Sequence, residues 1–134
     1  MTTEYKAVTA GIEVTVRTYF LEDQSDLDQG PWVWAYQVRI ANSGREPVQL
    51  LRRTWRITDA HGRIQIVQGA GVVGEQPVLE PGDAFEYTSG TPLETSSGIM
   101  VGTYHMIATD SGHEFDVTIP AFSLDSPGQR TRLH

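Results

Sequence analysis

The sequence predicts an all-β protein, a sandwich or barrel of about seven or more antiparallel strands. Two observations support this prediction. Apolar and polar residues alternate over several runs, which is the period of a half-buried strand. Turn-forming residues break the chain at short intervals, and no stretch shows a convincing helical period. The 134 residues suffice for one domain with a core of its own.

The clearest alternation covers residues 12–20 and 32–40. In the second run, two tryptophans and a tyrosine share one face: Trp32, Trp34 and Tyr36. Because aromatic side chains bury the most area per residue, we expect them at the centre of the core. The alternative is that these aromatics line a ligand groove.

Further runs rich in β-forming residues lie at 48–59, 64–67, 84–88, 100–109 and 113–119. Asp110-Ser111-Gly112 separates the last two and predicts a hairpin, while Ser89-Gly90 and Ser96-Ser97-Gly98 are typical of turns. We expect a single domain over residues 1–125 and a short polar tail over residues 126–134.

The composition argues against several classes of protein. The chain has no cysteine, which excludes disulfides, thiolate metal sites and a cysteine nucleophile. A net charge of −7 argues against a nucleic-acid partner. The sequence has no visible signal peptide, and no apolar run reaches the roughly 18 residues of a membrane span. We therefore expect a cytoplasmic protein that does not insert into a membrane.

One glycine motif is typical of phosphate binding. Gly69-Ala70-Gly71-Val72-Val73-Gly74 spells G-x-G-x-x-G and follows a predicted strand. In nucleotide sites this motif opens a helix, but Pro77 and Pro81 disfavour a helix here, and Glu75 adds a negative charge. We expect a glycine-rich loop that crosses between the sheets and uses positive φ angles. Binding of a nucleotide or pyrophosphate is the alternative.

The same loop is the candidate binding site for a protein partner. Val72 and Val73 lie between glycines, and we expect them to form an exposed apolar tip. The candidate binding residues are Gly69, Gly71, Val72, Val73, Gly74 and Glu75.

Histidines and carboxylates are the candidates for metal binding. The histidines are His61, His105, His113 and His134, and none has H-x-x-x-H or H-E-x-x-H spacing. An acidic stretch comprises Glu22, Asp23, Asp26 and Asp28, without the spacing of a calcium loop. We assign no metal ligand and no cofactor, and we interpret the acidic stretch as a solvated connection. Direct binding of a divalent metal through the histidine and carboxylate positions is the alternative.

No catalytic motif is visible, so we expect a protein that is not an enzyme. Arginines gather at Arg52-Arg53, Arg56 and Arg63. Arg53 shares the parity of the apolar Trp55, so we expect it either to lie at a β-bulge or to pair its head with a carboxylate. The alternative is that this basic strand docks an acidic partner.

Long segments of the chain resemble the ApaG family. They are Trp55–Gly62, Gly69–Leu79, Phe85–Gly90, Pro92–Thr95, Gly98–Met106 and Ile119–Phe122. The resemblance extends from about Val14 to Phe122 and includes Arg132-Leu133-His134 at the end. One departure is Thr91, where many relatives carry cysteine.

The resemblance implies a fibronectin type III-like, or immunoglobulin-like, β-sandwich. Bacterial members are small cytoplasmic proteins associated by name with cobalt and magnesium efflux or resistance, and related domains occur in multidomain eukaryotic proteins. We therefore expect a non-enzymatic protein–protein interaction module with an indirect role in cobalt and magnesium homeostasis. Its partner is an unidentified protein, and we expect a monomer or weak homodimer.

Overall fold

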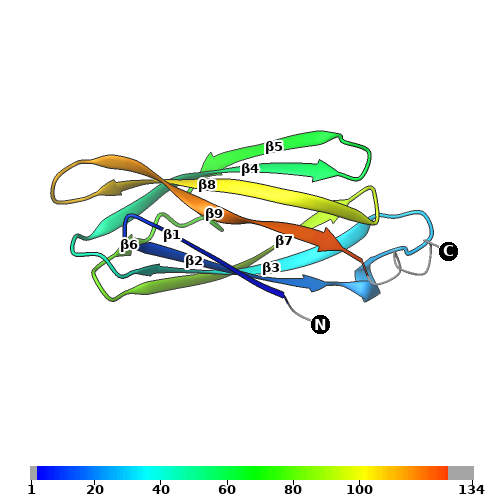
Figure 1. The fold of residues 1–134 in the computed structure, drawn as a ribbon, viewed down its shortest axis with the longest axis horizontal. Coiled ribbons are helices and arrows are strands. Elements are labelled where there is room, and N and C mark those ends of the chain that lie inside the picture. Colours follow the sequence, from blue (N-terminus) through cyan, green and yellow to red (C-terminus); the bar gives the residue numbers. More distant parts are fainter. Residues whose placement is uncertain (1–2, 127–134) are drawn as a thin grey trace.

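Two antiparallel sheets face each other across one core in the computed structural model, which describes residues 3–126 (Figure 1). The strands are β1 (Thr3–Thr9), β2 (Ile12–Phe20), β3 (Trp32–Asn42), β4 (Val48–Asp59), β5 (Ile64–Ala70), β6 (Val78–Leu79), β7 (Ala84–Leu93), β8 (Ser97–Ala108) and β9 (Glu114–Asp125). The only helix in the described part is a 3-10 turn, η1 (Glu22–Gln24). The predicted all-β class is confirmed.

The strand order defines which edges are open. Sheet A runs β1-β2-β3-β7, and sheet B runs β5-β4-β8-β9, with the short β6 also paired to β4. The sandwich is closed on the side of β1 and β9, where the Tyr5 and Ser123 hydroxyls lie 3.3 Å apart and the Thr118 amide donates to the Thr9 hydroxyl at 3.2 Å. On the opposite side β5 and β7 are the outermost strands, and β5 forms the upper margin of the molecule in Figure 1.

The aromatic residues expected in the core lie there. Trp34 and Tyr36 are 4% and 5% exposed. Tyr36 of sheet A meets Trp55 of sheet B edge-on, with ring centroids 5.5 Å apart, and Trp55 meets Phe122 in the same manner at 5.8 Å. These contacts place apolar side chains of both sheets in one continuous cluster, which is the main stabilising feature of a sandwich.

Two tyrosines join the sheets within this core. The hydroxyls of Tyr87 on β7 and Tyr104 on β8 hydrogen-bond to each other. Burial raises the pKa of both hydroxyls, because the ionised form would lose its hydration. Each hydroxyl is therefore the hydrogen-bond partner of the other in a buried place.

The predicted strands differ from the observed ones mainly at their ends. Residues 12–20 and 48–59 match β2 and β4, whereas the strand predicted at 64–67 extends to Ala70. The turn predicted at Ser89-Gly90 is wrong, because both residues lie inside β7 and continue its pairing with β3. The turn predicted at Ser96-Ser97-Gly98 is partly right: the bend between β7 and β8 includes Ser96, whereas Ser97 and Gly98 begin β8. β1 and β6 were not predicted.

At the predicted end of the domain, the first residue of the predicted tail packs against the sandwich. Ser126, assigned to the tail, is 3% exposed, and its amide donates to the Ser96 carbonyl at 3.0 Å. The rest of the predicted tail, residues 127–134, lies outside the described residues.

Candidate functional site

The glycine motif ends β5 and forms a tight hairpin. The amides and carbonyls of Val72 and Glu75 bond reciprocally, at 2.8 and 2.9 Å. Between them Val73 and Gly74 have φ angles of 42° and 82°, which is the pattern of a type I′ turn. A β-branched residue rarely adopts a positive φ, so Val73 holds a strained backbone at the tip of the hairpin.

Two glycines of this motif lie where a larger residue would collide with its neighbours. Gly71 has a φ of 62°, and a Cβ there would lie 2.1 Å from the Glu75 carbonyl oxygen. A Cβ on Gly69 would lie 2.8 Å from Nη1 of Arg53. The chain then continues into β6, which pairs with the same strand as β5. The expected positive φ angles are present, but the expected crossing between sheets is wrong, because the loop connects two strands of sheet B.

The expected apolar tip is half correct. Val73 is 54% exposed, but Val72 is fully buried and belongs to the core. The reciprocal hydrogen bonds turn the chain so that consecutive valines point in opposite directions, Val72 inward and Val73 outward. Gly74 and Glu75 are exposed with Val73. A partner would thus meet Val73, Gly74 and Glu75, while Gly69, Gly71 and Val72 hold the hairpin in place.

Arg53 on β4 holds the base of the hairpin by hydrogen bonds. The register of β4 against β8 shifts between Leu50 and Arg52, so the expected irregularity is present. The alternative arrangement, a carboxylate paired with the head of Arg53, does not occur within residues 3–126. Nη1 of Arg53 instead donates to the carbonyls of Gly71 at 2.8 Å and Ala70 at 3.3 Å. The loop carbonyls point at this cation, and the motif leads into the strand β6 instead of a helix whose amides would hold a phosphate.

Four exposed aliphatic side chains gather on the outer face of sheet B. We call them the aliphatic patch: Ile64 (50% exposed), Ile66 (55%), Ile99 (51%) and Val101 (44%). The strand register makes them neighbours. Thr58 of β4 lies between Ile64 and Ile99, and Arg56 lies between Ile66 and Val101. Adjacent strands are about 4.8 Å apart, so these side chains form one surface across three strands.

Sequence reasoning missed this patch. In Ile64-Gln65-Ile66-Val67 and Ile99-Met100-Val101, apolar residues occupy both parities, so alternation identifies the strand but not a second apolar face. A signal was present in the repeated apolar residues opposite to the core parity. Their union into one patch, however, depends on the pairing of β4 with both β5 and β8.

Arg56 is the charged residue within the patch. Its side chain is exposed, and it makes no ion pair within residues 3–126. Arg63, at the turn before β5, is paired with Asp59 at 2.8 Å and with Glu94 at 3.4 Å. Arg56 therefore offers an uncompensated positive charge among aliphatic side chains.

The polar end of the same face carries a histidine cluster. Nε2 of His105 lies 2.7 Å from Glu114, and Nδ1 lies 2.8 Å from Asp116. The hydrogen bond to Glu114, followed by that to Asp116, raises the pKa of His105, and the same contact lowers the pKa of Glu114. The two ring nitrogens point in opposite directions, so the two carboxylates do not converge on one point beside the ring.

The other candidate metal ligands are dispersed. Within residues 3–126 no group of three or more histidine or carboxylate side chains could hold an ion. His61 and His113 are exposed, and the His113 ring stacks on Phe115. His134 lies outside the described residues. In the acidic stretch, Asp26 accepts hydrogen bonds from the amides of Asp28 and Gln29, which fixes the turn before β3.

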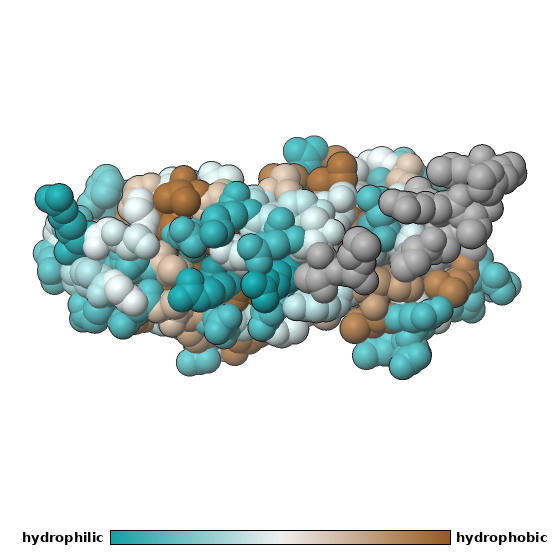
Figure 2. All heavy atoms as spheres, turned by 60° about the horizontal axis from the view of Figure 1, so that its bottom comes forward, coloured by the Kyte–Doolittle hydropathy of each residue, from teal (hydrophilic) through white to brown (hydrophobic). Residues whose placement is uncertain are grey.

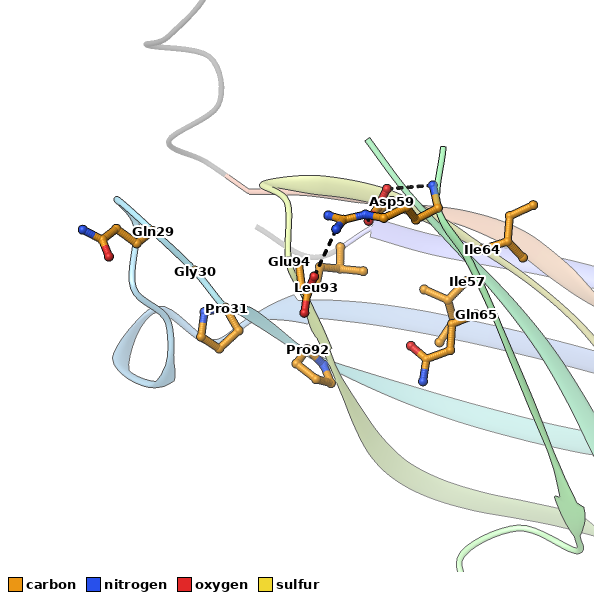
Figure 3. Close-up of a pocket in the computed structure, with 11 residues that line it drawn as sticks. Gln29, Gly30, Pro31, Ile57, Asp59, Ile64, Gln65, Pro92, Leu93 and Glu94 are labelled. Carbon is orange, nitrogen blue, oxygen red and sulfur yellow. Dashed lines mark hydrogen bonds and ion pairs between the residues drawn. The ribbon is translucent and has the colours of Figure 1, made fainter. Parts of the chain in front are cut away.

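A hollow lies at the open side of the sandwich, beside the start of β5. This pocket of about 780 Å³ lies between the β4–β5 turn, the end of β7 and the turn before β3 (Figure 3). Ile57 and Gln65 point into it from sheet B, and Leu93 lines it from β7. Ile64 projects to the other side of β5 from Gln65 (Figure 3).

The described part of the chain also holds no helix long and apolar enough to cross a membrane.

This architecture is that of a two-sheet antiparallel β-sandwich protein. The family model described as ApaG domain matches residues 22–108, and the chain belongs to this family. It is 63% identical over 130 residues to Protein ApaG of Paramagnetospirillum magneticum, covering 97% of this chain and 99% of that one. It is 62% identical over 128 residues to Protein ApaG of Rhodospirillum centenum, covering 96% and 98%.

Solved structures agree with this assignment. The crystal structure of a putative ApaA protein from Bordetella pertussis superposes with a TM-score of 0.83 at 48% identity, covering 87% of this chain and 94% of that one. The C-terminal domain of Wzt superposes with a TM-score of 0.54 at 11% identity, covering 92% of this chain and 77% of that one. The second likeness concerns the fold alone.

Proposed function

We propose that this protein is a non-enzymatic protein–protein interaction module and that the aliphatic patch is its principal docking surface. The observation that carries the proposal is the exposure of Ile64 and Ile66 on β5 and of Ile99 and Val101 on β8, on one sheet face and on either side of β4. Contiguous exposed apolar surface is uncommon on monomeric proteins and marks sites of interaction. None of these side chains points into the core between the sheets, so their apolar character serves something other than the fold.

The surroundings of the patch fit the anatomy of an interface. Threonines on β4 and β8 and the exposed Arg56 lie among and beside the aliphatic side chains, and arginine is enriched at protein interfaces. Farther along the same face the His105 cluster forms a polar margin. The hairpin tip, with Val73 and Glu75, lies beyond the other end of β5 from Ile64. We include this exposed part of the glycine loop in the proposed binding surface as a second contact point.

A role in cobalt and magnesium homeostasis is proposed to be indirect, exerted through the bound partner. The resemblance to the ApaG family suggests the homeostatic role, and the occupation of both His105 nitrogens by carboxylates supports the indirect route. A titration with Co²⁺ followed by amide NMR tests this. We expect weak broadening spread over the histidines, and saturable broadening near one equivalent around His105 would overturn the indirect route.

The docking surface is tested by a matched pair of valine substitutions. Val101→Lys places a charge in the patch, whereas Val8→Lys places one on β1 of sheet A, where Val8 is 63% exposed. Each immobilised variant is used to capture proteins from a lysate of the source organism, and the captured proteins are identified. We expect Val101→Lys to lose a protein that both the wild type and Val8→Lys retain. Equal capture by all three folded proteins would contradict the proposal.

A further inference from the structure

Strand β5 has an unusually unprotected free edge. The other outermost strands carry features that oppose pairing with a further strand. These features are Glu4 and Lys6 on β1, Glu86 and Pro92 on β7, and Glu114 and Pro120 on β9. β5, by contrast, reads Ile-Gln-Ile-Val-Gln-Gly-Ala over residues 64–70, with neither a charge nor a proline. Most of its residues are exposed.

The backbone groups on this free edge can be assigned. Directly before β5 the Arg63 carbonyl accepts a hydrogen bond from the Asp59 amide, and directly after it the Gly71 amide donates one to the Leu51 carbonyl. The odd-numbered residues of this segment therefore bond toward β4. In an antiparallel ladder the bonding direction alternates along the strand. The amides and carbonyls of Ile64, Ile66 and Gln68 therefore point away from β4, where an added strand would pair with them.

The two sides of β5 differ in chemistry. On the inner side the pocket of about 780 Å³ has an apolar wall that includes Ile57, Pro92 and Leu93, and its polar lining includes Gln65 and the ion-paired Arg63 (Figure 3). On the outer side the exposed Arg56 lies beside Ile66. A strand added to β5 would project alternate side chains into the pocket and over the arginine.

We propose that β5 binds an extended segment of a partner protein as an added strand, with aliphatic side chains directed into the pocket and carboxylates directed toward Arg56. This inference rests on the proposed function and specifies how the partner docks. Main-chain hydrogen bonds supply affinity in this mode, and pockets for alternate side chains supply specificity. The segment would extend from the pocket toward the hairpin tip at Val73.

Charge favours such a segment over a second copy of this chain. β5 contains no carboxylate, so a second copy paired strand to strand in any register would offer Arg56 no acidic partner from the added strand. Each copy also carries a net charge of −7, so that two copies repel each other. A short foreign segment carries fewer negative charges than a second copy, so it meets a smaller repulsion while it presents carboxylates to Arg56.

The test uses a pair of labelled synthetic peptides and a pair of variants. One peptide alternates valine and glutamate over the length of β5, and the other alternates valine and lysine. Gln68→Pro removes an amide from the free edge, where proline is tolerated because that amide faces solvent. Gln68→Ala is its matched control, because it loses the same side chain but keeps the amide. Binding is measured by fluorescence anisotropy, and folding by amide NMR.

We expect the glutamate peptide to bind the wild type and Gln68→Ala equally and Gln68→Pro at least about tenfold more weakly. We expect the lysine peptide to bind the wild type at least about tenfold more weakly than the glutamate peptide, and Arg56→Gln to reduce this preference. The Arg56 variant keeps the test decisive if Gln68→Pro fails to fold. Absence of glutamate-peptide binding up to about 1 mM would overturn the proposal.

Two further outcomes separate this inference from the proposed function. Sedimentation that shows a dimer in the wild type but not in Gln68→Pro would assign the edge to a second copy and overturn the inference. If Val101→Lys loses the captured protein while Gln68→Pro retains it, the interaction module stands and strand addition is wrong. If both variants retain it, the aliphatic patch as docking surface and the strand addition are both wrong.

Discussion

The outer faces of the two sheets are built differently on the same core. On sheet A, Arg17 pairs with Glu4 at 2.7 Å and Lys6 with Glu13 at 3.5 Å. Figure 2, in which the side of sheet A comes forward, shows hydrophilic side chains over its middle and hydrophobic ones in small separate groups. Sheet B instead presents the aliphatic patch. The inward residues of both sheets form the core, so the core does not account for the difference between the outer faces. The proposed docking surface on sheet B does account for it.

Loss of a core side chain shared by the sheets should have the largest effect. Phe122 is 1% exposed and packs against Tyr36 of sheet A and Trp55 of sheet B. We expect Phe122→Ala to lower the free energy of unfolding by about 3–5 kcal/mol, because it removes apolar contacts and leaves a cavity. Urea unfolding followed by amide NMR measures it. Separate transitions for the two sheets would show that the faces do not share one cooperative core.

The His105 cluster at the polar end of sheet B should make a smaller contribution to the free energy of unfolding, and this contribution should depend on pH. The pKa of His105 is raised in the folded state, so its contribution to stability is fully present below the unfolded value of about 6.5 and is lost as pH rises through the folded value. We expect this contribution to be below about 1 kcal/mol, since the cluster is at the surface. Measuring unfolding from about pH 5 to about pH 9 follows this contribution.

A second histidine on the same hairpin provides the control. His105→Gln should flatten that pH profile, whereas His113→Gln should leave it unchanged, because His113 stacks on Phe115 and has no carboxylate within ion-pair distance in the described structure. A profile that survives His105→Gln would contradict the assignment.

The aliphatic patch should show the smallest effect on stability. Ile99 is 51% exposed and lies outside the core, so we expect Ile99→Thr to change the free energy of unfolding by no more than about 0.5 kcal/mol. Urea unfolding beside the wild type measures it. A loss of about 2 kcal/mol or more would mean that the patch serves folding, and the contrast between the two outer faces would lose its functional meaning.

The inward faces were predictable from sequence because burial enforces a period of two, as at Val14, Val16 and Val38. The outer patch was not, because it depends on which strands are neighbours, and strand order is not written in any one strand. Within the candidate loop, the positive φ angles followed from the glycines. The burial of Val72 did not, because it results from how the hairpin folds back on Glu75.

The hairpin at the end of β5 also bears on how this surface can be diversified. At Gly71 even the methyl group of alanine would collide with the Glu75 carbonyl, so this position accepts only glycine. At Gly74 an added Cβ would meet nothing within 4 Å, and only the backbone conformation limits substitution. New recognition properties can therefore be introduced at the tip, by replacement or insertion, while the base of the hairpin stays fixed.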